Sequence, residues 1–181
     1  MNQAELDLLV LAAQQGNKKA FGFLFKHFHQ PLIGFAFKLS NNKDFANDAV
    51  QDTWIKVSKN IRRLNDPRAF RSWLYKLLRW RIIDYQRKLA KESISIDDDS
   101  KFNDSNEEAI YWEEHPQKDE TLVMAIERLP AIEKQMIHLF YLQELTISEI
   151  SIVLDIAAGT IKSRLNRARK MLKRKYENLE K

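Results

Sequence analysis

Residues 145–175, LTISEISIVLDIAAGTIKSRLNRARKMLKRK, predict the fold of the C-terminal part of the chain. Thr146 and Glu149 have the spacing of a capping box, in which each side chain satisfies a free backbone N–H at the start of a helix. We expect a short helix there, then a tight turn at residues 154–157, and then a second helix with apolar residues at helical spacing. Two short helices joined in this way predict a helix-turn-helix, whose second helix fits the major groove of DNA.

The second of these helices carries polar side chains opposite its apolar stripe. Arginine, lysine, asparagine and serine can donate to base edges and to phosphates, as reading a groove requires. The candidate residues for binding duplex DNA are Thr160, Lys162, Ser163, Arg164, Asn166, Arg167 and Lys170. A basic, solvated helix at the end of a bundle would show the same periodicity. The capping box, the turn length and the concentration of donors favour DNA binding over that alternative.

Helical periodicity also fills the N-terminal half, and the whole chain has only 4 glycines and 4 prolines. Pro31 is expected to interrupt the second helix, and RRLNDPR at residues 62–68 is expected to form a loop. The apolar residues recur at helical spacing in four segments, which are 4–14, 18–39, 45–57 and 70–88. The sequence therefore predicts an all-α fold.

Charge divides the chain into the same parts. The net charge is +5, yet residues 93–120 are strongly acidic and lack a sustained helical period, so we predict a flexible linker there. Two helical domains are expected to flank it, an N-terminal one at residues 1–92 and a C-terminal one with the helix-turn-helix at residues 121–181. Both flanking blocks are basic and suit a polyanionic partner, since each neutralised phosphate releases condensed counterions. A solvated surface would have the same composition.

Composition also excludes several classes of protein. With 0 cysteines, disulfide scaffolds and thiolate metal sites are excluded. The N-terminus has no basic segment or cleavage site typical of a signal peptide, and no apolar stretch reaches the roughly 18 residues that a membrane span needs. We therefore expect a soluble, cytoplasmic protein that does not insert into the membrane.

No catalytic residues, cofactor motif or metal site can be nominated. His27 and His29 stand two apart on a predicted helix and so face different directions. There is no glycine-rich phosphate loop, and Asp97-Asp98-Asp99 lacks the glycine and distal glutamate of a calcium loop. The chain is not expected to be an enzyme or to hold a cofactor.

Motifs in both halves resemble one family, the extracytoplasmic-function (ECF) group of bacterial sigma factors in the sigma-70 family. In the C-terminal half they are Leu129-Pro130, Leu145-Thr146, Glu149-Ile150 and the run Gly159-Thr160-Ile161-Lys162-Ser163-Arg164-Leu165. In the N-terminal half they are Asp48-Ala49-Val50-Gln51-Asp52-Thr53-Trp54 and Phe70-Arg71-Ser72-Trp73-Leu74-Tyr75. Their joint order and spacing make the resemblance specific.

The resemblance implies a factor that binds core RNA polymerase and directs it to promoter DNA. The acidic face with Asp44, Asp48, Gln51 and Asp52 would dock on the clamp helices of the largest catalytic subunit. The C-terminal domain would lie at the flap region and bind the −35 element, while the N-terminal domain would open the −10 element. An anti-sigma factor is the regulator that such proteins typically have.

The helix at 70–88 mixes aromatic and basic side chains, as a trap for unpaired bases needs. Phe70, Trp73 and Tyr85 fit its apolar stripe and are expected to be buried. Tyr75 and Trp80 lie off the stripe and are the predicted stacking residues. With the preceding loop, the predicted contacts to the melted strand are Asn65, Arg68, Arg71, Tyr75, Lys76, Arg79 and Trp80.

Three positions depart from the family pattern. Asp155 and Glu144 stand where the family usually has glycine, so some backbone strain is expected at both. Trp80 replaces a usual asparagine near the DNA, which leaves the base preference of the melted region open.

Other functions remain as alternatives. A stand-alone helix-turn-helix regulator would bind duplex DNA without polymerase, usually as a symmetric dimer, and no dimerisation helix is evident. A nuclease would need clustered carboxylates and a divalent ion. A helical adaptor that binds only protein is the third alternative.

Overall fold

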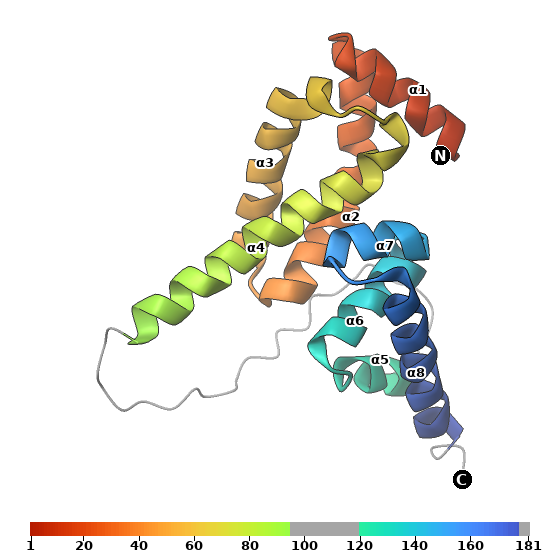
Figure 1. Cartoon of the computed structure of the whole chain (residues 1–181). Helices are drawn as coiled ribbons and strands as arrows, with labels where there is room; N and C mark the ends of the chain where they lie inside the picture. The colour runs from red at the N-terminus through yellow and green to blue at the C-terminus, as the bar shows by residue number, and fades with distance from the viewer. Residues whose placement is uncertain (95–119, 178–181) are drawn as a thin grey trace.

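The structure is a computed structural model that describes residues 1–94 and 120–177, and the regular elements within these two ranges are all helical. This confirms the all-α prediction. The predicted acidic linker, residues 93–120, lies almost wholly outside the described residues. Figure 1 shows the helices in two groups. The first comprises α1 (Gln3–Gln14), α2 (Lys18–Ser40), α3 (Lys43–Asn60), the short 3₁₀ turns η1 (Ile61–Arg63) and η2 (Pro67–Ala69), and α4 (Phe70–Ile94). The second comprises α5 (Glu120–Glu127), α6 (Ala131–Ile137), the π turn η3 (His138–Leu142), α7 (Ile147–Leu154) and α8 (Ala158–Glu177).

Asparagine side chains set where the first three helices begin. The Asn2, Asn17 and Asn42 side chains accept hydrogen bonds from backbone N–H groups in the first turns of α1, α2 and α3. At α1 the Glu5 carboxylate also accepts from the Asn2 N–H, at 2.9 Å, which completes a capping box. Such caps satisfy donors that a helix start leaves without partners.

The predicted interruption at Pro31 is wrong, because α2 is continuous across it. A proline inside a helix lacks an N–H and removes one backbone hydrogen bond. The residues on either side compensate, since Phe28, Leu32 and Phe35 from successive turns of α2 are all buried in the core. Burial of these side chains on both sides of Pro31 outweighs one lost hydrogen bond.

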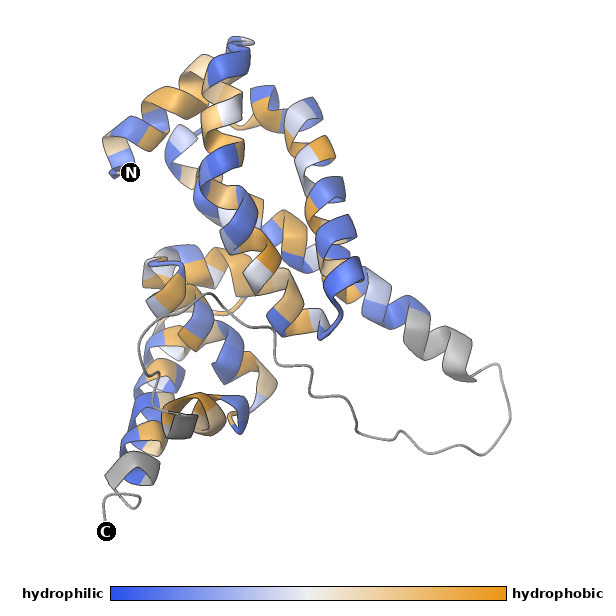
Figure 2. Ribbon diagram, turned by 180° about the vertical axis from the view of Figure 1, so that it is seen from behind, coloured by the Kyte–Doolittle hydropathy of each residue, from blue (hydrophilic) through white to orange (hydrophobic). Residues whose placement is uncertain are grey.

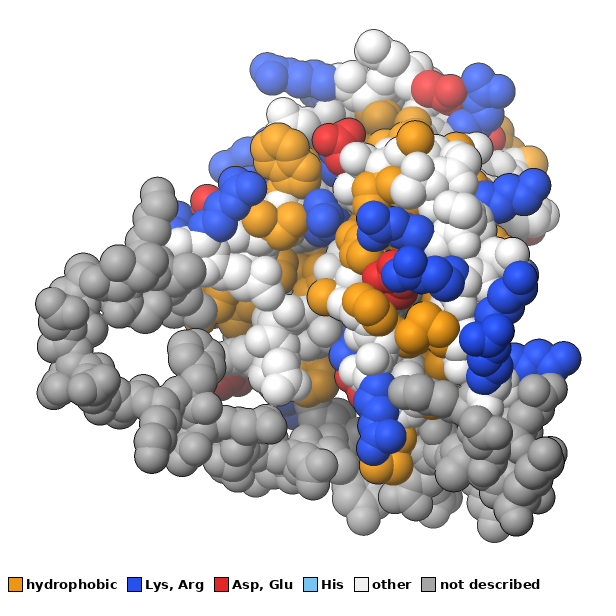
Figure 3. Space-filling model, turned by 60° about the horizontal axis from the view of Figure 1, so that its bottom comes forward, with side chains coloured by type: hydrophobic (Ala, Val, Ile, Leu, Met, Phe, Trp, Pro, Cys, Tyr) orange, Lys and Arg blue, Asp and Glu red, His pale blue; other side chains and the backbone are white. Residues whose placement is uncertain are grey.

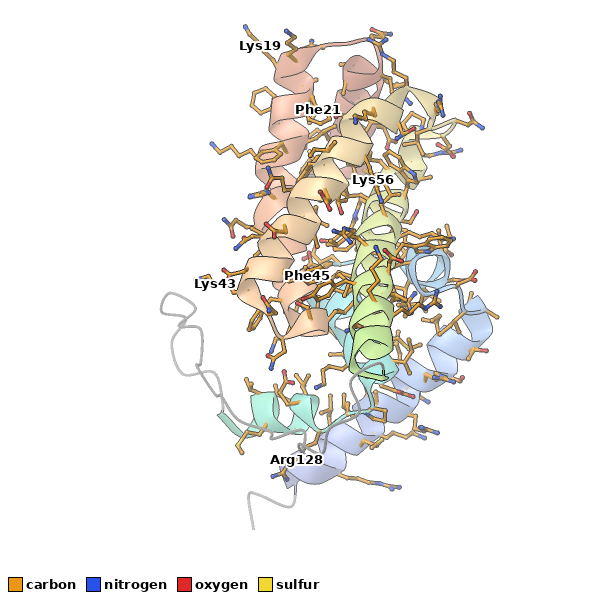
Figure 4. All side chains as sticks on the ribbon, turned by 90° about the vertical axis from the view of Figure 1, so that its left-hand side faces the viewer. Lys19, Phe21, Lys43, Phe45, Lys56 and Arg128 are labelled. Carbon is orange, nitrogen blue, oxygen red and sulfur yellow. The ribbon has the colours of Figure 1, made fainter. Side chains whose placement is uncertain are left out.

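The core of the N-terminal group lies where α2, α3 and α4 meet. Leu24, Val50, Leu74 and Leu78 are fully buried there. The ring of Phe45, on the α3 side that faces α4 in Figure 4, stacks on Tyr85 with 3.7 Å between ring centroids. Figure 2 shows the apolar residues of these helices mainly on their inward sides. The regular apolar spacing in the sequence thus becomes one shared core.

In the C-terminal group, α6, α7 and α8 contribute Met136, Ile150, Ile161 and Leu165 to the buried core, which is continuous with that of the first group. The predicted capping box is confirmed: Thr146 Oγ1 accepts from the Glu149 N–H at 3.2 Å, and Glu149 accepts from the Thr146 N–H at 2.8 Å. The turn between α7 and α8 begins at Asp155, so the predicted helix-turn-helix is present.

Both positions where the family usually has glycine have a left-handed backbone. The φ angle is 52° at Glu144 and 58° at Asp155. A Cβ atom crowds the backbone in this region, which glycine avoids. The strain expected from the sequence is therefore present at both turns.

The two groups contact each other. Helix α7 lies across the first half of α4 (Figure 1), and Arg79 of α4 donates a hydrogen bond to Gln135 of α6. Among the described residues, no helix is both long and apolar enough to cross a membrane.

Candidate nucleic-acid and polymerase interface

Helix α8 presents the predicted donors on one surface, which we call the reader face: Thr160, Lys162, Ser163, Arg164, Asn166, Arg167 and Lys170. All are exposed except Arg164, which is half-buried. The opposite stripe of α8, with Ile161, Leu165 and Ala168, is buried against α6 and α7. The helix-turn-helix packing therefore fixes which side of α8 faces outward. That side has the donor chemistry needed to contact DNA.

A buried carboxylate that the sequence did not single out lies beneath the reader face. Glu133 of α6 is 3% exposed, and its Oε1 lies 3.8 Å from Arg164 Nη1 and 3.6 Å from Arg167 Nη2. Its Oε2 has no hydrogen-bond partner in the described part of the chain. The signal in the sequence that could have pointed to Glu133 is its place on the same predicted helix as the apolar Met136 and Ile137, one turn before them.

The acidic face of α3 is partly as predicted. Asp44, Asp48 and Gln51 are exposed along one side of the helix. Asp52 is less accessible, because its carboxylate accepts a hydrogen bond of 2.8 Å from Arg81 Nε of α4. Asp52 therefore ties α3 to α4, and the acidic side chains left without this ion pair are Asp44 and Asp48, with the neutral Gln51 beside them.

The loop before α4 is organised locally. Asn65 is exposed, and Asp66 caps η2 by accepting from the Arg68 N–H. The Arg68 guanidinium also donates to both carboxylate oxygens of Asp66, at 3.0 to 3.2 Å. These hydrogen bonds from Arg68 lower the pKa of Asp66. Both side chains are largely exposed, so Arg68 can exchange this partner for a phosphate at little cost.

Trp80 is 66% exposed on α4, as expected for a stacking residue, and Lys76 beside it is half-buried. Tyr75, the other predicted stacking residue, is buried in this conformation, and its contact with a melted base stays a prediction. Tyr75 is 1% exposed, and its ring contacts Phe35 at 5.5 Å between centroids. Burial raises the pKa of Tyr75, so its hydroxyl stays protonated and can donate. The predicted burial of Phe70 is confirmed, whereas Trp73 and Tyr85 are half-buried.

Tyr75 is covered because the C-terminal group packs on α4. The Tyr75 hydroxyl donates to Gln143 Oε1, and Arg71 Nη2 donates to the Gln143 carbonyl oxygen at 2.6 Å. Arg71 Nε also lies 3.7 Å from Glu149 Oε1, and Arg79 Nε donates to Gln135 Oε1 at 3.2 Å. We call these six residues the domain junction: Arg71, Tyr75, Arg79, Gln135, Gln143 and Glu149. Three of the predicted melted-strand residues therefore contact the other helical group instead of solvent.

The domain junction has two further supports. Gln143 Nε2 lies 3.1 Å from Nε2 of His138. Burial lowers the pKa of His138 to about 4, and the nearby charge of Lys38 lowers it to a smaller extent. Neutral His138 can accept a hydrogen bond from the Gln143 amide. Nearby, Lys38 of α2 pairs with Glu127 of α5 at 2.7 Å, and Lys134 pairs with the same carboxylate at 2.8 Å.

Basic side chains also gather on the face shown in Figure 3. On the face shown in Figure 3, Lys and Arg side chains cover more of the described surface than Asp and Glu do. Within residues 1–94 and 120–177, no group of three His, Cys, Asp or Glu side chains is placed to hold a metal ion.

Comparisons with known protein families and curated proteins agree with this geometry. The family model described as Sigma-70 region 2 matches residues 24–92, and the one described as Sigma-70, region 4 matches residues 119–172. The RNA polymerase sigma factor SigZ of Bacillus subtilis is 33% identical over 156 residues, which cover 85% of each chain. SigV of the same organism is 31% identical over 144 residues, 80% of this chain and 83% of SigV. The ECF RNA polymerase sigma-E factor of Haemophilus influenzae is 28% identical over 183 residues, 94% of this chain and 95% of that protein.

Solved structures show the same fold. The sigma factor RpoE from Bartonella quintana, crystallised with the anti-sigma factor NepR, matches with a TM-score of 0.67 and 25% identity. That match covers 88% of this chain and 98% of RpoE. CnrH, solved with the cytosolic domain of CnrY, matches with a TM-score of 0.66 and 20% identity over 96% of this chain and 98% of CnrH.

Proposed function

Since the chain belongs to the ECF group of the sigma-70 family, we propose that it binds core RNA polymerase in the cytoplasm and directs it to specific promoters. The observation that carries this proposal is the separation of two surfaces on two helical groups. The reader face on α8 is basic and exposed, whereas the exposed end of α3 is acidic through Asp44 and Asp48. One chain can therefore engage DNA and a basic protein surface at the same time.

Each surface has a separate task in this proposal. The reader face contacts the −35 element in the duplex major groove, and the C-terminal group lies at the polymerase flap region. Asp44, Asp48 and Gln51 dock on the clamp helices of the largest catalytic subunit, and Asp52 positions that face through Arg81. Trp80, Lys76, Asn65 and Arg68 hold the opened −10 strand by stacking and by contacts to the backbone. No covalent step is assigned to the chain.

Activity requires the domain junction to open. Arg71, Tyr75 and Arg79 can reach the melted strand only when α6 and the segment around Gln143 leave α4, because their polar atoms are engaged there. We refer to the state described here as closed and to the separated state as open. Binding to polymerase would favour the open state by holding the two helical groups apart on different subunits.

Regulation by an anti-sigma factor is part of the proposal. RpoE of Bartonella quintana, which shares the fold, was crystallised with such a partner. A protein that holds the two helical groups together would keep Arg71, Tyr75 and Arg79 in the domain junction and away from the melted strand.

Transcription in a purified system tests the proposal. Core RNA polymerase is incubated with sheared genomic DNA, with and without the protein, and RNA 5′ ends are sequenced. We expect new start sites that share two spaced upstream motifs. Arg164→Ala with Arg167→Ala should weaken upstream-element binding and spare polymerase binding, and Asp48→Ala with Gln51→Ala should do the reverse. Absence of new starts together with failure to co-elute with core would favour a stand-alone DNA-binding regulator.

A further inference from the structure

We propose that Glu133 is a positioning residue for DNA recognition, which fixes the guanidinium groups of Arg164 and Arg167 from beneath the reader face. The inference rests on the proposed function, because it concerns how the reader face discriminates between sequences. It adds a residue on α6, outside the helix-turn-helix, to those that decide specificity.

The geometry places one carboxylate oxygen between two arginines. Arg164 and Arg167 are three positions apart and so share one side of α8. Oε1 of Glu133 lies 3.8 Å from the first and 3.6 Å from the second. The Arg164 and Arg167 side chains are 41% and 68% exposed, while that of Glu133 is 3% exposed. The anion is thus fixed in the protein, and the two cations extend from it toward solvent.

Both separations are longer than an N–H···O hydrogen bond, which is usually about 2.7–3.2 Å. Electrostatic attraction therefore restricts where the guanidinium groups lie without occupying their donors. The N–H groups of both arginines remain available for base edges and phosphates. Arginine has many rotamers, and a side chain that is already oriented loses less entropy on binding. Glu133 is expected to improve the geometry of base contacts more than the strength of binding to the phosphate backbone.

Fold stability explains this residue only in part, through the favourable interaction of an acid in the first turn of α6 with the helix dipole. Glu133 is almost fully buried, makes no hydrogen bond through Oε2 in the described residues, and has only two long ion pairs. A buried charge that is poorly satisfied generally contributes little to stability or lowers it. Glutamate at this place is better explained by its effect on the two arginines above it.

The test uses the full chain bound to core polymerase. The promoter is first identified with the wild-type protein from RNA 5′ ends, as above. Binding is then measured for that promoter and for a copy with a scrambled upstream element, over a range of salt concentrations. We expect Glu133→Gln to reduce the ratio of the two affinities about tenfold, which is within the range of one good arginine–base contact. Its affinity for the scrambled copy should stay the same or rise, because a negative charge near DNA has been removed.

Glu144→Gln is the matched control, since Glu144 is an exposed acid of the same helical group that makes no ion pair or hydrogen bond with the described residues. It removes the same charge and should leave the affinity ratio unchanged. The decisive comparison repeats Glu133→Gln in a chain that already carries Arg164→Ala and Arg167→Ala. If Glu133 acts through these arginines, its effect on the ratio disappears there.

Three results would overturn the inference. The first is an unchanged affinity ratio in Glu133→Gln. The second is an equal loss of the affinity ratio when Arg164 and Arg167 are already alanine. The third is a loss of the affinity ratio that accompanies a large drop in melting temperature. Failure of the proposed function looks different, since the wild-type protein would then give no promoter from which to begin.

Discussion

Replacing Gln143 with alanine should open the domain junction. The Gln143 side chain accepts from the Tyr75 hydroxyl and lies within hydrogen-bond distance of His138. Alanine removes both interactions but keeps the backbone carbonyl that accepts from Arg71. In the closed state the Tyr75 hydroxyl would be buried without an acceptor, whereas in the open state water satisfies it.

The size of the effect follows from this difference between the two states. A buried donor without a partner costs about 1–3 kcal/mol. Because about 1.4 kcal/mol corresponds to a factor of ten, the ratio of open to closed chains should rise roughly 5- to 150-fold. Gln86→Ala is the control, since Gln86 makes one exposed hydrogen bond, to the Leu39 carbonyl within the N-terminal group. It should leave the equilibrium unchanged.

The distance between the two helical groups reports the equilibrium directly. The chain has 0 cysteines, so a cysteine introduced in place of Lys56 on α3 and another in place of Arg128 after α5 would be the two sites for fluorescent dyes. Both positions are exposed and are labelled in Figure 4. Single-molecule energy transfer should show a low-efficiency population that increases in Gln143→Ala. An unchanged distribution in a folded variant would refute the role assigned to Gln143 at the junction.

Three further predictions concern single residues. Glu144→Gly should raise the free energy of unfolding, measured by urea titration, by about 0.5–1 kcal/mol, because glycine relieves the left-handed backbone strain. Glu144→Ala should give no such gain. Equal effects of the two substitutions on the free energy of unfolding would argue against backbone strain. Lowering the pH from 7.5 to 5.5 should reduce the free energy of unfolding by about 1 kcal/mol because of His138. Its pKa is about 4 in the folded chain, so in this pH range the unfolded chain binds the proton and the folded chain does not. His138→Gln should remove that part of the pH dependence, and a persisting slope would assign it to other groups. Trp80→Ala should shorten the lifetime of open promoter complexes about tenfold through loss of one base stack, with little change in melting temperature because Trp80 is exposed. A lifetime equal to that of wild type would exclude Trp80 from strand capture.

The features that could be predicted from the sequence are those that depend on near neighbours along the chain. Helix periods, the Thr146–Glu149 capping box and the turn at Asp155 involve residues a few positions apart, so local spacing was sufficient to predict them. The reader face on α8 was predictable for the same reason, because one apolar stripe fixes which side of a helix faces outward.

Tertiary structure decided the features that depend on which surfaces meet. Tyr75 was assigned off the apolar stripe of α4, yet it is buried, with its ring against Phe35 of α2 and its hydroxyl on Gln143, 68 positions further along the chain. The Asp52 carboxylate on the acidic face is paired with Arg81, 29 positions away. The same holds for Glu133, whose relation to Arg164 and Arg167 exists only once α6 packs beneath α8. Periodicity shows which residues share a side of one helix, but the partner of that side is chosen by packing between helices, which no local pattern contains.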